Sequence, residues 1–386
     1  MKDCGIFSIF YRNYNYGGQL QAYGMCKAIE KMGFSSEQIC YVRDKSFLKH
    51  KVIVVLKKTV KEKKDLARRY VNRFVLKLGV GAKYTEKTIQ KFDQFMKAIP
   101  HSNIYYSYDI KDSEMKYQCF ISGSDQVWNP DTCSDEWFLN FLDNKKPRIA
   151  YSASIGKEYF TEEEQHRLKP LIEKYQFIGV RENKAKELVE QYTNKSAEVV
   201  LDPVMLLSKD EWSKFDKWNF LKNEEYICVY LVAYNKKIER QALAYANKLN
   251  KKAVFITDPR NVLNQNPRGY WTPFKDGVGP EEFIALLLNA KLVITNSFHG
   301  MALSINFGKN FWAYYSRAVN DKNTLNSRID TVLDTFELKD RLTNTEVYLN
   351  ENELMEEIDY QKVFEILNNR RDKCAVMLKN AIERSL

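Results

Sequence analysis

Long apolar runs are missing from this sequence, and none approaches the length needed to span a bilayer. Cysteine is sparse: the seven residues, an odd number, stand at wide spacings without a CxxC pair. This pattern indicates neither a zinc site nor a disulfide framework, so we expect no bound metal. The start, Met1–Phe10, is strand-like and leads into a polar loop, unlike a signal peptide. These absences favour a reduced, cytoplasmic protein.

Positive charge is the first strong feature that is present. The 386 residues carry a net charge of +10, from 60 basic and 50 acidic side chains. This excess favours acidic partners, and it is concentrated in Lys49–Lys87, where Lys and Arg alternate with apolar residues. Two interpretations stay open: basic amphipathic helices that bind an anionic membrane surface, or a solvated helical insertion with a basic outer face. We place this insertion at about residues 46–100 and expect no nucleic-acid partner.

Short apolar runs of strand length alternate with helical patterns along most of the chain. Such alternation is typical of parallel sheets covered by helices. The stretch Leu206–Asn223 has no strong strand signal, so we place the crossing between two domains there. The sequence therefore predicts an α/β protein with two Rossmann-like domains facing across a cleft. We assign them to residues 1–205 and 206–345, followed by C-terminal helices over 346–386.

The clearest strand–turn–helix unit is Leu292–Gly308. A short buried strand is followed by Asn296 and Ser297, both good helix caps, and then by helical apolar spacing. His299, one of only four histidines, lies in the first helical turn. Free backbone N–H groups there suit an anion, and the helix dipole disfavours the charged imidazole. His299 is therefore a candidate acid/base residue; the alternative is a capping histidine on an ordinary turn.

Two further loops follow predicted strands and point to the same ligand crevice. Gly17 and Gly18 stand at a predicted helix start, where the absent side chains let the backbone approach a bound group closely. Their spacing is not GxGxxG, so it gives no case for NAD. Ser124 and Asp125 lie in a small polar loop after the strand Gln118–Ser122. Asp125 is a candidate general base, or alternatively a turn residue.

Six motifs occur in a fixed order between about residues 5 and 335. They are Asn15-Tyr16-Gly17-Gly18 with Gln21-Ala22, Ser122-Gly123-Ser124-Asp125-Gln126-Val127-Trp128-Asn129, Tyr151-Ser152-Ala153-Ser154, Val180-Arg181-Glu182, Leu201-Asp202-Pro203 and Thr295-Asn296-Ser297-Phe298-His299-Gly300. Together they resemble the polysaccharide pyruvyl transferase family. The resemblance implies a GT-B-like architecture with the active cleft between its two domains.

The resemblance also implies an activity: transfer of the pyruvyl group of phosphoenolpyruvate to two hydroxyls of a sugar, forming a cyclic ketal. The sugar would belong to a cell-surface polysaccharide, such as an exopolysaccharide or capsule, or to its lipid-linked precursor. Phosphoenolpyruvate would be the donor substrate, and no cofactor is implied. A lipid-linked acceptor would place the protein peripherally at the inner face of the membrane.

Residue roles follow from the same resemblance. His299 matches the family histidine, and Arg181 matches the arginine at the start of the VRE helix. We assign His299 to acid/base work with Asp125 in a second such role, and we assign Arg181 and Arg328 to anion binding. Ser297 departs from the family, because better-known members often have an arginine there. By motif position the nearest substitutes are Arg328, Arg12 and Arg148, and for the last two alone a surface role is expected.

Two other functions fit the same architecture. A GT-B-type glycosyltransferase would take a nucleotide-sugar donor, and it too would need a basic pocket and an acid/base residue. A non-catalytic carbohydrate-binding protein of polysaccharide assembly would explain the missing arginine at Ser297. A glycosyltransferase and a pyruvyl transferase are distinguished by which labelled donor, the nucleotide-sugar or phosphoenolpyruvate, labels the product. Ligand binding that survives mutation of His299 would indicate a carbohydrate-binding protein.

Overall fold

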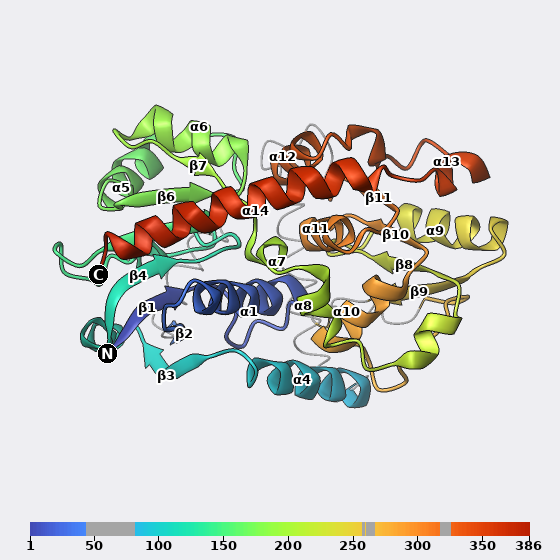
Figure 1. Ribbon diagram of the computed structural model, residues 1–386, viewed down its shortest axis with the longest axis horizontal. Coiled ribbons are helices and arrows are strands. Elements are labelled where there is room, and N and C mark those ends of the chain that lie inside the picture. The colour runs from blue at the N-terminus through green and yellow to red at the C-terminus, as the bar shows by residue number, and fades with distance from the viewer. Residues whose placement is uncertain (44–81, 257–258, 260–266, 317–325) are drawn as a thin grey trace.

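Two separate parallel sheets, one from each half of the chain, form the framework of the molecule (Figure 1). The computed structural model describes residues 1–43, 82–256, 259, 267–316 and 326–386. Most of the basic segment Lys49–Lys87 therefore lies outside the described residues. Only its last part is described, at the start of helix α4 (Ala82–Met96).

The first sheet has seven strands in the order β3-β2-β1-β4-β5-β6-β7, and every neighbouring pair is parallel. The strands are β1 (Lys2–Phe7), β2 (Ser36–Val42), β3 (His101–Tyr106), β4 (Tyr117–Ser122), β5 (Arg148–Ala153), β6 (Phe177–Val180) and β7 (Glu198–Val199). The helices of this half are α1 (Tyr16–Lys31), α4, α5 (Glu162–Ile172) and α6 (Asn183–Tyr192).

The second sheet has five parallel strands in the order β12-β11-β10-β8-β9. The strands are β8 (Tyr226–Tyr230), β9 (Lys252–Ile256), β10 (Leu292–Thr295), β11 (Phe311–Tyr314) and β12 (Leu342–Thr343). The helices of this half are α9 (Lys236–Lys248), α10 (Pro280–Asn289), α11 (Phe298–Phe307) and α12 (Ser327–Thr335). Two parallel sheets with covering helices confirm the predicted α/β class.

Residues 200–225 link the two sheets without adding a strand to either. They form the short helices α7 (Pro203–Leu206) and α8 (Lys209–Ser213) and a 3-10 turn at Asn219–Asn223. Asp202 caps α7 by accepting a hydrogen bond from the Val204 N–H at 3.0 Å. The cap and the proline that follows it start the helix directly after the last strand of the first sheet.

The C-terminal helix α14 (Tyr360–Glu383) runs back across both halves (Figure 1). It follows the short helix α13 (Glu351–Met355) and packs against α11 of the second half and against α7 and β5 of the first. The buried thiol of Cys374 accepts a hydrogen bond from the Leu201 N–H at 3.3 Å. The predicted C-terminal helices therefore cover the junction of the two halves.

Aromatic packing also joins the two halves. Tyr16, at the start of α1, stacks on Phe283 of α10 with ring centroids 4.4 Å apart. Its hydroxyl donates to the Val278 carbonyl at 2.8 Å, so the buried ring leaves no polar group unsatisfied. One apolar core accordingly runs from the first half into the second.

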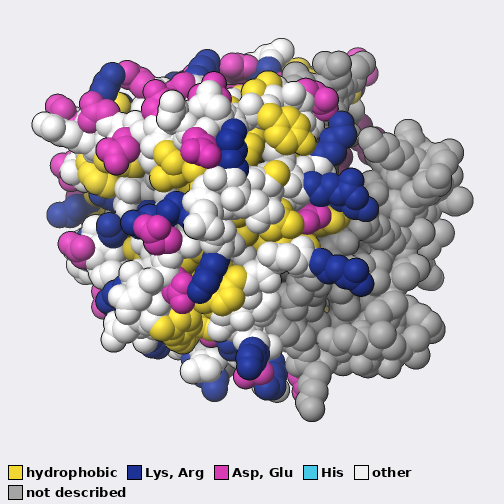
Figure 2. All heavy atoms as spheres, turned by 90° about the vertical axis from the view of Figure 1, so that its right-hand side faces the viewer, with side chains coloured by type: hydrophobic (Ala, Val, Ile, Leu, Met, Phe, Trp, Pro, Cys, Tyr) yellow, Lys and Arg dark blue, Asp and Glu magenta, His cyan; other side chains and the backbone are white. Residues whose placement is uncertain are grey.

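Charge is almost balanced outside the basic segment. Residues 44–81 contain 12 of the 60 basic and 3 of the 50 acidic side chains, and so nine of the ten net positive charges. Figure 2 accordingly shows basic and acidic side chains interspersed over the described part of one face. None of the described helices is both long enough and apolar enough to cross a bilayer.

Candidate active site

The carboxyl ends of strands from both sheets meet at the candidate site. The loops after β4, β6 and β7 bring Asp125, Arg181 and Asp202 from the first half, and the turn after β10 brings His299 from the second. In open α/β sheets this edge is where ligands bind. The sequence predicted this placement for Asp125 and His299, and the family resemblance alone pointed to Arg181.

Arg181 is the buried centre of this cluster. Its two terminal nitrogens contact Asp125 Oδ1 and Asp202 Oδ2, each at 3.2 Å, and only 1% of its side chain is exposed. The guanidinium also lies over the Phe298 ring, 4.4 Å from the centroid. Because Phe298 begins α11, this cation–π contact links the two domains directly. Arg181 Nε is buried and has no hydrogen-bond partner among the described residues.

Glu182 explains why the arginine is held so firmly. Its Oε1 accepts hydrogen bonds from the Ser154 hydroxyl at 3.0 Å and from the N–H groups of Ile155 and Gly156 at 2.9 and 3.1 Å. The loop after β5 is thereby fastened to the end of β6. A carboxylate that accepts several such bonds fixes the backbone of its neighbour, Arg181.

Asp202 is the residue that the sequence analysis missed as part of the site. It is fully buried, and its Oδ2 accepts hydrogen bonds from the Ser124 hydroxyl at 2.7 Å and from Arg181 at 3.2 Å. The same oxygen lies 3.8 Å from His299 Nε2. A helix-capping Asp–Pro pair directly after a parallel strand was the signal available, since that position lies at the ligand edge of the sheet.

His299 is buried where the starts of two helices meet. A Cβ built on Gly17 of α1 would lie 2.0 Å from His299 Nδ1, so the glycine leaves space that the imidazole fills. The space beside Gly17 was predicted to hold a bound group, but in the structure a side chain of the other domain fills it. His299 Nε2 faces Asp202 without a hydrogen bond to any described residue.

Burial lowers the pKa of His299, and the charges of Arg181 and Arg328 add to this effect. Asp202 and Asp125 raise the pKa but do not cancel the effect of burial. The imidazole is therefore neutral over a wider pH range than an exposed histidine and is able to accept a proton.

Burial raises the pKa of Asp125, but the positive charge of Arg181, with those of Arg328 and of His299 when it is protonated, outweighs burial and leaves the pKa below its usual value. Burial lowers the pKa of Arg181, and Asp125, Asp202 and Glu182 reverse this effect and raise it. Asp125 is thus an ionised carboxylate that is suited to accepting a hydrogen bond. It also has a positive φ of 72°, in the loop where its carbonyl accepts from the Ser154 N–H at 2.9 Å.

The other predicted binding residues divide into two groups. Ser124 joins the cluster through Asp202, and Gly18 accommodates the nearby Ile9 carbonyl at the start of α1. Asn296 and Ser297 instead support the turn that carries the histidine. Asn296 Nδ2 donates to the Ala233 carbonyl at 2.6 Å, and Ser297 caps α11 by accepting from the Gly300 N–H at 3.4 Å.

The three arginines considered as substitutes for the missing one have different positions. Arg328, in the first turn of α12, lies close enough to affect the pKa of both Asp125 and His299. Arg12 is exposed and lies over its neighbour Tyr11. The expected surface role of Arg148 is wrong: the residue is fully buried, and its guanidinium donates to the carbonyls of Leu139, Leu142, Asp143 and Lys146.

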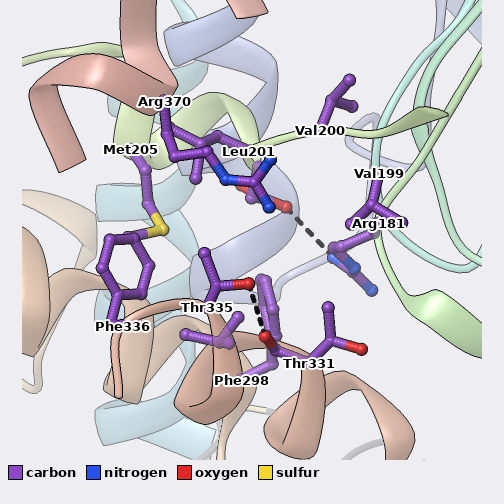
Figure 3. Close-up of a pocket in the computed structure, with 12 residues that line it drawn as sticks. Arg181, Val199, Val200, Leu201, Met205, Phe298, Thr331, Thr335, Phe336 and Arg370 are labelled. Carbon is purple, nitrogen blue, oxygen red and sulfur yellow. Dashed lines mark hydrogen bonds and ion pairs between the residues drawn. The ribbon is translucent and has the colours of Figure 1, made fainter. Parts of the chain in front are cut away.

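One cavity adjoins the cluster, and a second shares Thr331 with it. The first, of about 20 Å³, lies beside Arg181 and Asp202 and is closed by α12 and α14 (Figure 3). The other is a groove of about 360 Å³ between α6 and α12, lined mainly by polar side chains. Among the described residues, no group of His, Cys, Asp and Glu side chains is arranged to hold a metal ion.

Comparison with solved structures identifies the class of this architecture. A UDP-N-acetylglucosamine 2-epimerase from Rickettsia bellii matches with a TM-score of 0.52 at 10% identity, covering 100% of this chain and 98% of that chain. The Neisseria meningitidis UDP-GlcNAc 2-epimerase bound to UDP-GlcNAc gives 0.45 at 10%, covering 99% and 98%. The spinosyn rhamnosyltransferase SpnG gives 0.43 at 10%, covering 100% and 96%. The Rickettsia bellii match and the two parallel sheets together show a two-domain, GT-B-like α/β fold.

The family follows from the sequence. The family model of polysaccharide pyruvyl transferase matches residues 15–317, and the chain therefore belongs to this family. It is a transferase of polysaccharide biosynthesis, as the motifs predicted. A search of the curated proteins gives no match. Helices α12 and α14, which close the small cavity, lie beyond the matched region.

Proposed function

We propose that this enzyme transfers the pyruvyl group of phosphoenolpyruvate to two hydroxyls of one sugar, forming a cyclic ketal. The observation that carries the proposal is the meeting of His299 with the Arg181–Asp202 pair across the two domains. It places a neutral proton acceptor beside a buried cluster of one arginine and two carboxylates at the ligand edge of both sheets.

Ketal formation makes demands that this cluster is able to meet. The methylene carbon of the donor gains a proton, and a sugar hydroxyl loses its proton as its oxygen bonds to the adjacent carbon. The bond from that carbon to the phosphate oxygen breaks, phosphate leaves with the proton of the second hydroxyl, and the second oxygen closes the ring. His299 is the candidate to carry these protons, while Asp125 accepts a hydrogen bond from the attacking hydroxyl.

Positive charge is needed for the phosphate and carboxylate of the donor. Arg328 supports this role, because its charge reaches both Asp125 and His299. Arg181 attracts an anion less strongly than the sequence suggested, because two carboxylates already contact it and offset its positive charge. The N-terminus of α11 adds a partial positive charge beside His299.

The groove between α6 and α12 is the proposed acceptor site. Its volume, about 360 Å³, fits a small ligand, and Asn183, Asn326 and Tyr315 line it together with the carboxylates Glu187 and Asp330. Amides and carboxylates hydrogen-bond sugar hydroxyls, and a tyrosine ring offers a stacking face. The acidic lining disfavours the trianionic donor and favours a neutral, hydroxyl-rich acceptor.

A lipid-linked sugar is the acceptor we propose, with the cytoplasmic enzyme bound peripherally at an anionic membrane. The charge of Lys49–Lys87 supports this proposal, because its 13 basic and 3 acidic side chains give a net charge of +10, equal to that of the whole chain. The product would then be incorporated into an exopolysaccharide or a capsule.

The donor is tested by incubating the enzyme with lipid-linked sugars and either labelled phosphoenolpyruvate or labelled nucleotide-sugars. The proposal expects label from phosphoenolpyruvate in the sugar product, with one phosphate released for each ketal formed. Label entering only from a nucleotide-sugar would show a glycosyltransferase instead. Sugar binding without transfer from either donor would show a carbohydrate-binding protein.

A further inference from the structure

A second arginine, from a part of the chain that the family match does not reach, faces the cluster. Arg370 lies on α14 and, with Arg181 and Phe298, lines the cavity of about 20 Å³. In Figure 3 its side chain extends toward Arg181, and Asp202 lines the same cavity. Thr331 and Thr335 of α12 line the same cavity.

Arg370 and the adjacent Arg371 differ in their hydrogen bonds. Arg371 donates to the carbonyls of Met205 and Leu207 and to the side chains of Asn306 and Asn368, so it fastens α14 to the protein. Within the described part of the chain, Arg370 makes no hydrogen bond or ion pair, although it is half-buried. A half-buried guanidinium with unused donors is suited to a ligand anion.

The other cation at this cavity still has one unused donor. Both terminal nitrogens of Arg181 are taken by Asp125 and Asp202, while its buried Nε has no partner among the described residues. An unpaired buried donor is costly, and an anion in the cavity would satisfy it. The cavity therefore has N–H donors from two arginines, and its one carboxylate, Asp202, already accepts hydrogen bonds from Arg181 and Ser124 through Oδ2.

We infer that Arg370 and Arg181 form a subsite for one oxyanion group of the donor substrate. The inference rests on the proposed function and adds a binding residue, Arg370, to that site. A volume of about 20 Å³ holds roughly one water-sized group, so the cavity would admit a single oxygen of that oxyanion group and leave the rest of the donor outside. Arg370 would then supply the charge that is missing at Ser297.

The test is calorimetric titration of the full chain with phosphoenolpyruvate, inorganic phosphate and pyruvate. Arg370→Gln should raise the Kd for phosphoenolpyruvate by about 10- to 100-fold, the usual effect of losing a hydrogen bond to a charged group. Arg370→Lys should lose less, because it keeps the charge. Lys373→Gln is the matched control: Lys373 is exposed on the same helix, and its loss should leave all three affinities unchanged.

The two fragments identify which end of the donor is bound. A loss for phosphate alone places the phosphoryl group in the subsite, and a loss for pyruvate alone places the carboxylate there. If wild type binds phosphate through Arg370 but does not bind phosphoenolpyruvate, the subsite stands and the proposed function fails. The inference is overturned if Arg370→Gln binds all three probes as wild type does, or if wild type binds none of them.

Discussion

At the scale of single residues, the site depends on one buried carboxylate that two functional side chains share. Asp202 accepts from Arg181 and lies beside His299, so it links the residue proposed for anion binding to the residue proposed for proton transfer. Sequence reasoning found both of its partners but not Asp202. A capping Asp is common, and only the tertiary fold shows which residues its second oxygen faces.

The pH dependence of activity follows from the lowered pKa of His299. A protonated imidazole cannot accept a proton, so activity falls as the pH drops through a folded-state pKa that lies below about 6.5. Asp202→Asn removes a charge that raises this pKa. In this variant the loss of activity at low pH should therefore occur at still lower pH, with a reduced maximal rate. Measuring the rates of both proteins across pH with the same substrates checks this, because any titration of the substrates affects both proteins equally.

An unchanged acidic limb, or one moved to higher pH, would show that His299 does not titrate in the rate-limiting step. The Asn side chain keeps an oxygen that can accept from the Val204 N–H, so α7 should remain capped in this variant.

At the scale of elements, the sequence predicted most of the strands and helices that build the site. For β10 and α11 the predicted bounds, Leu292–Thr295 and Phe298–Phe307, agree with the structure, because an apolar run and a 3.6-residue period are both strong signals. The strand β3 was missed. It lies at the sheet edge, and of its six residues only Tyr105 is buried, so it shows no apolar run.

The close approach of α1 and α11 could not be predicted from local sequence patterns. Glycines at a helix start indicate that something lies close, but they do not say whether it is a ligand or a side chain. Only the docking of the two domains reveals that His299 occupies the space at Gly17.

Gly17→Ala tests this contact. An alanine in a helix normally adds about 0.5–1 kcal/mol of stability over glycine. Here its Cβ would lie 2.0 Å from the imidazole, so the clash should win and lower the free energy of unfolding by about 1–3 kcal/mol. In a His299→Ala background that loss should disappear, which denaturant unfolding of the four proteins measures.

Gly24→Ala provides the matched control on the same helix. Its Cβ would lie 2.6 Å from the Pro203 carbonyl and not near His299. Its destabilisation should therefore be the same with or without the histidine. If the loss from Gly17→Ala also persists without the histidine, the close packing of α1 against His299 is not its cause.

At the scale of the whole molecule, two domains share one core, and α14 covers their junction. The fold class was predicted from the alternation of strand and helix patterns, and the family from the order of motifs along the chain. The domain limits at residues 205 and 345 stay a prediction, although the strands of the two sheets lie on either side of residues 200–225. The return of α14 across both domains was not predicted, because amphipathic spacing does not say which surface a helix packs against.

The stability of the molecule should depend on this packing. Leu378 on α14 is fully buried, so Leu378→Ala should lower the free energy of unfolding by about 2–5 kcal/mol. Val376, on the same helix, is 58% exposed, and Val376→Ala should change it by no more than about 0.5 kcal/mol. Equal effects in urea unfolding of the two variants would contradict the contribution assigned to α14.

The most direct test of the proton-transfer role of His299 is single-turnover kinetics of His299 variants, measured together with donor binding. Both His299→Ala and His299→Gln should lower the rate of pyruvyl transfer by about 10²- to 10⁴-fold, because glutamine has no titratable proton. Binding of phosphoenolpyruvate should change far less, since Arg328, Arg370 and the start of α11 remain. If either variant transfers pyruvyl at the wild-type rate while folded as wild type, the histidine only caps and packs the helix start, and the account of its role is wrong.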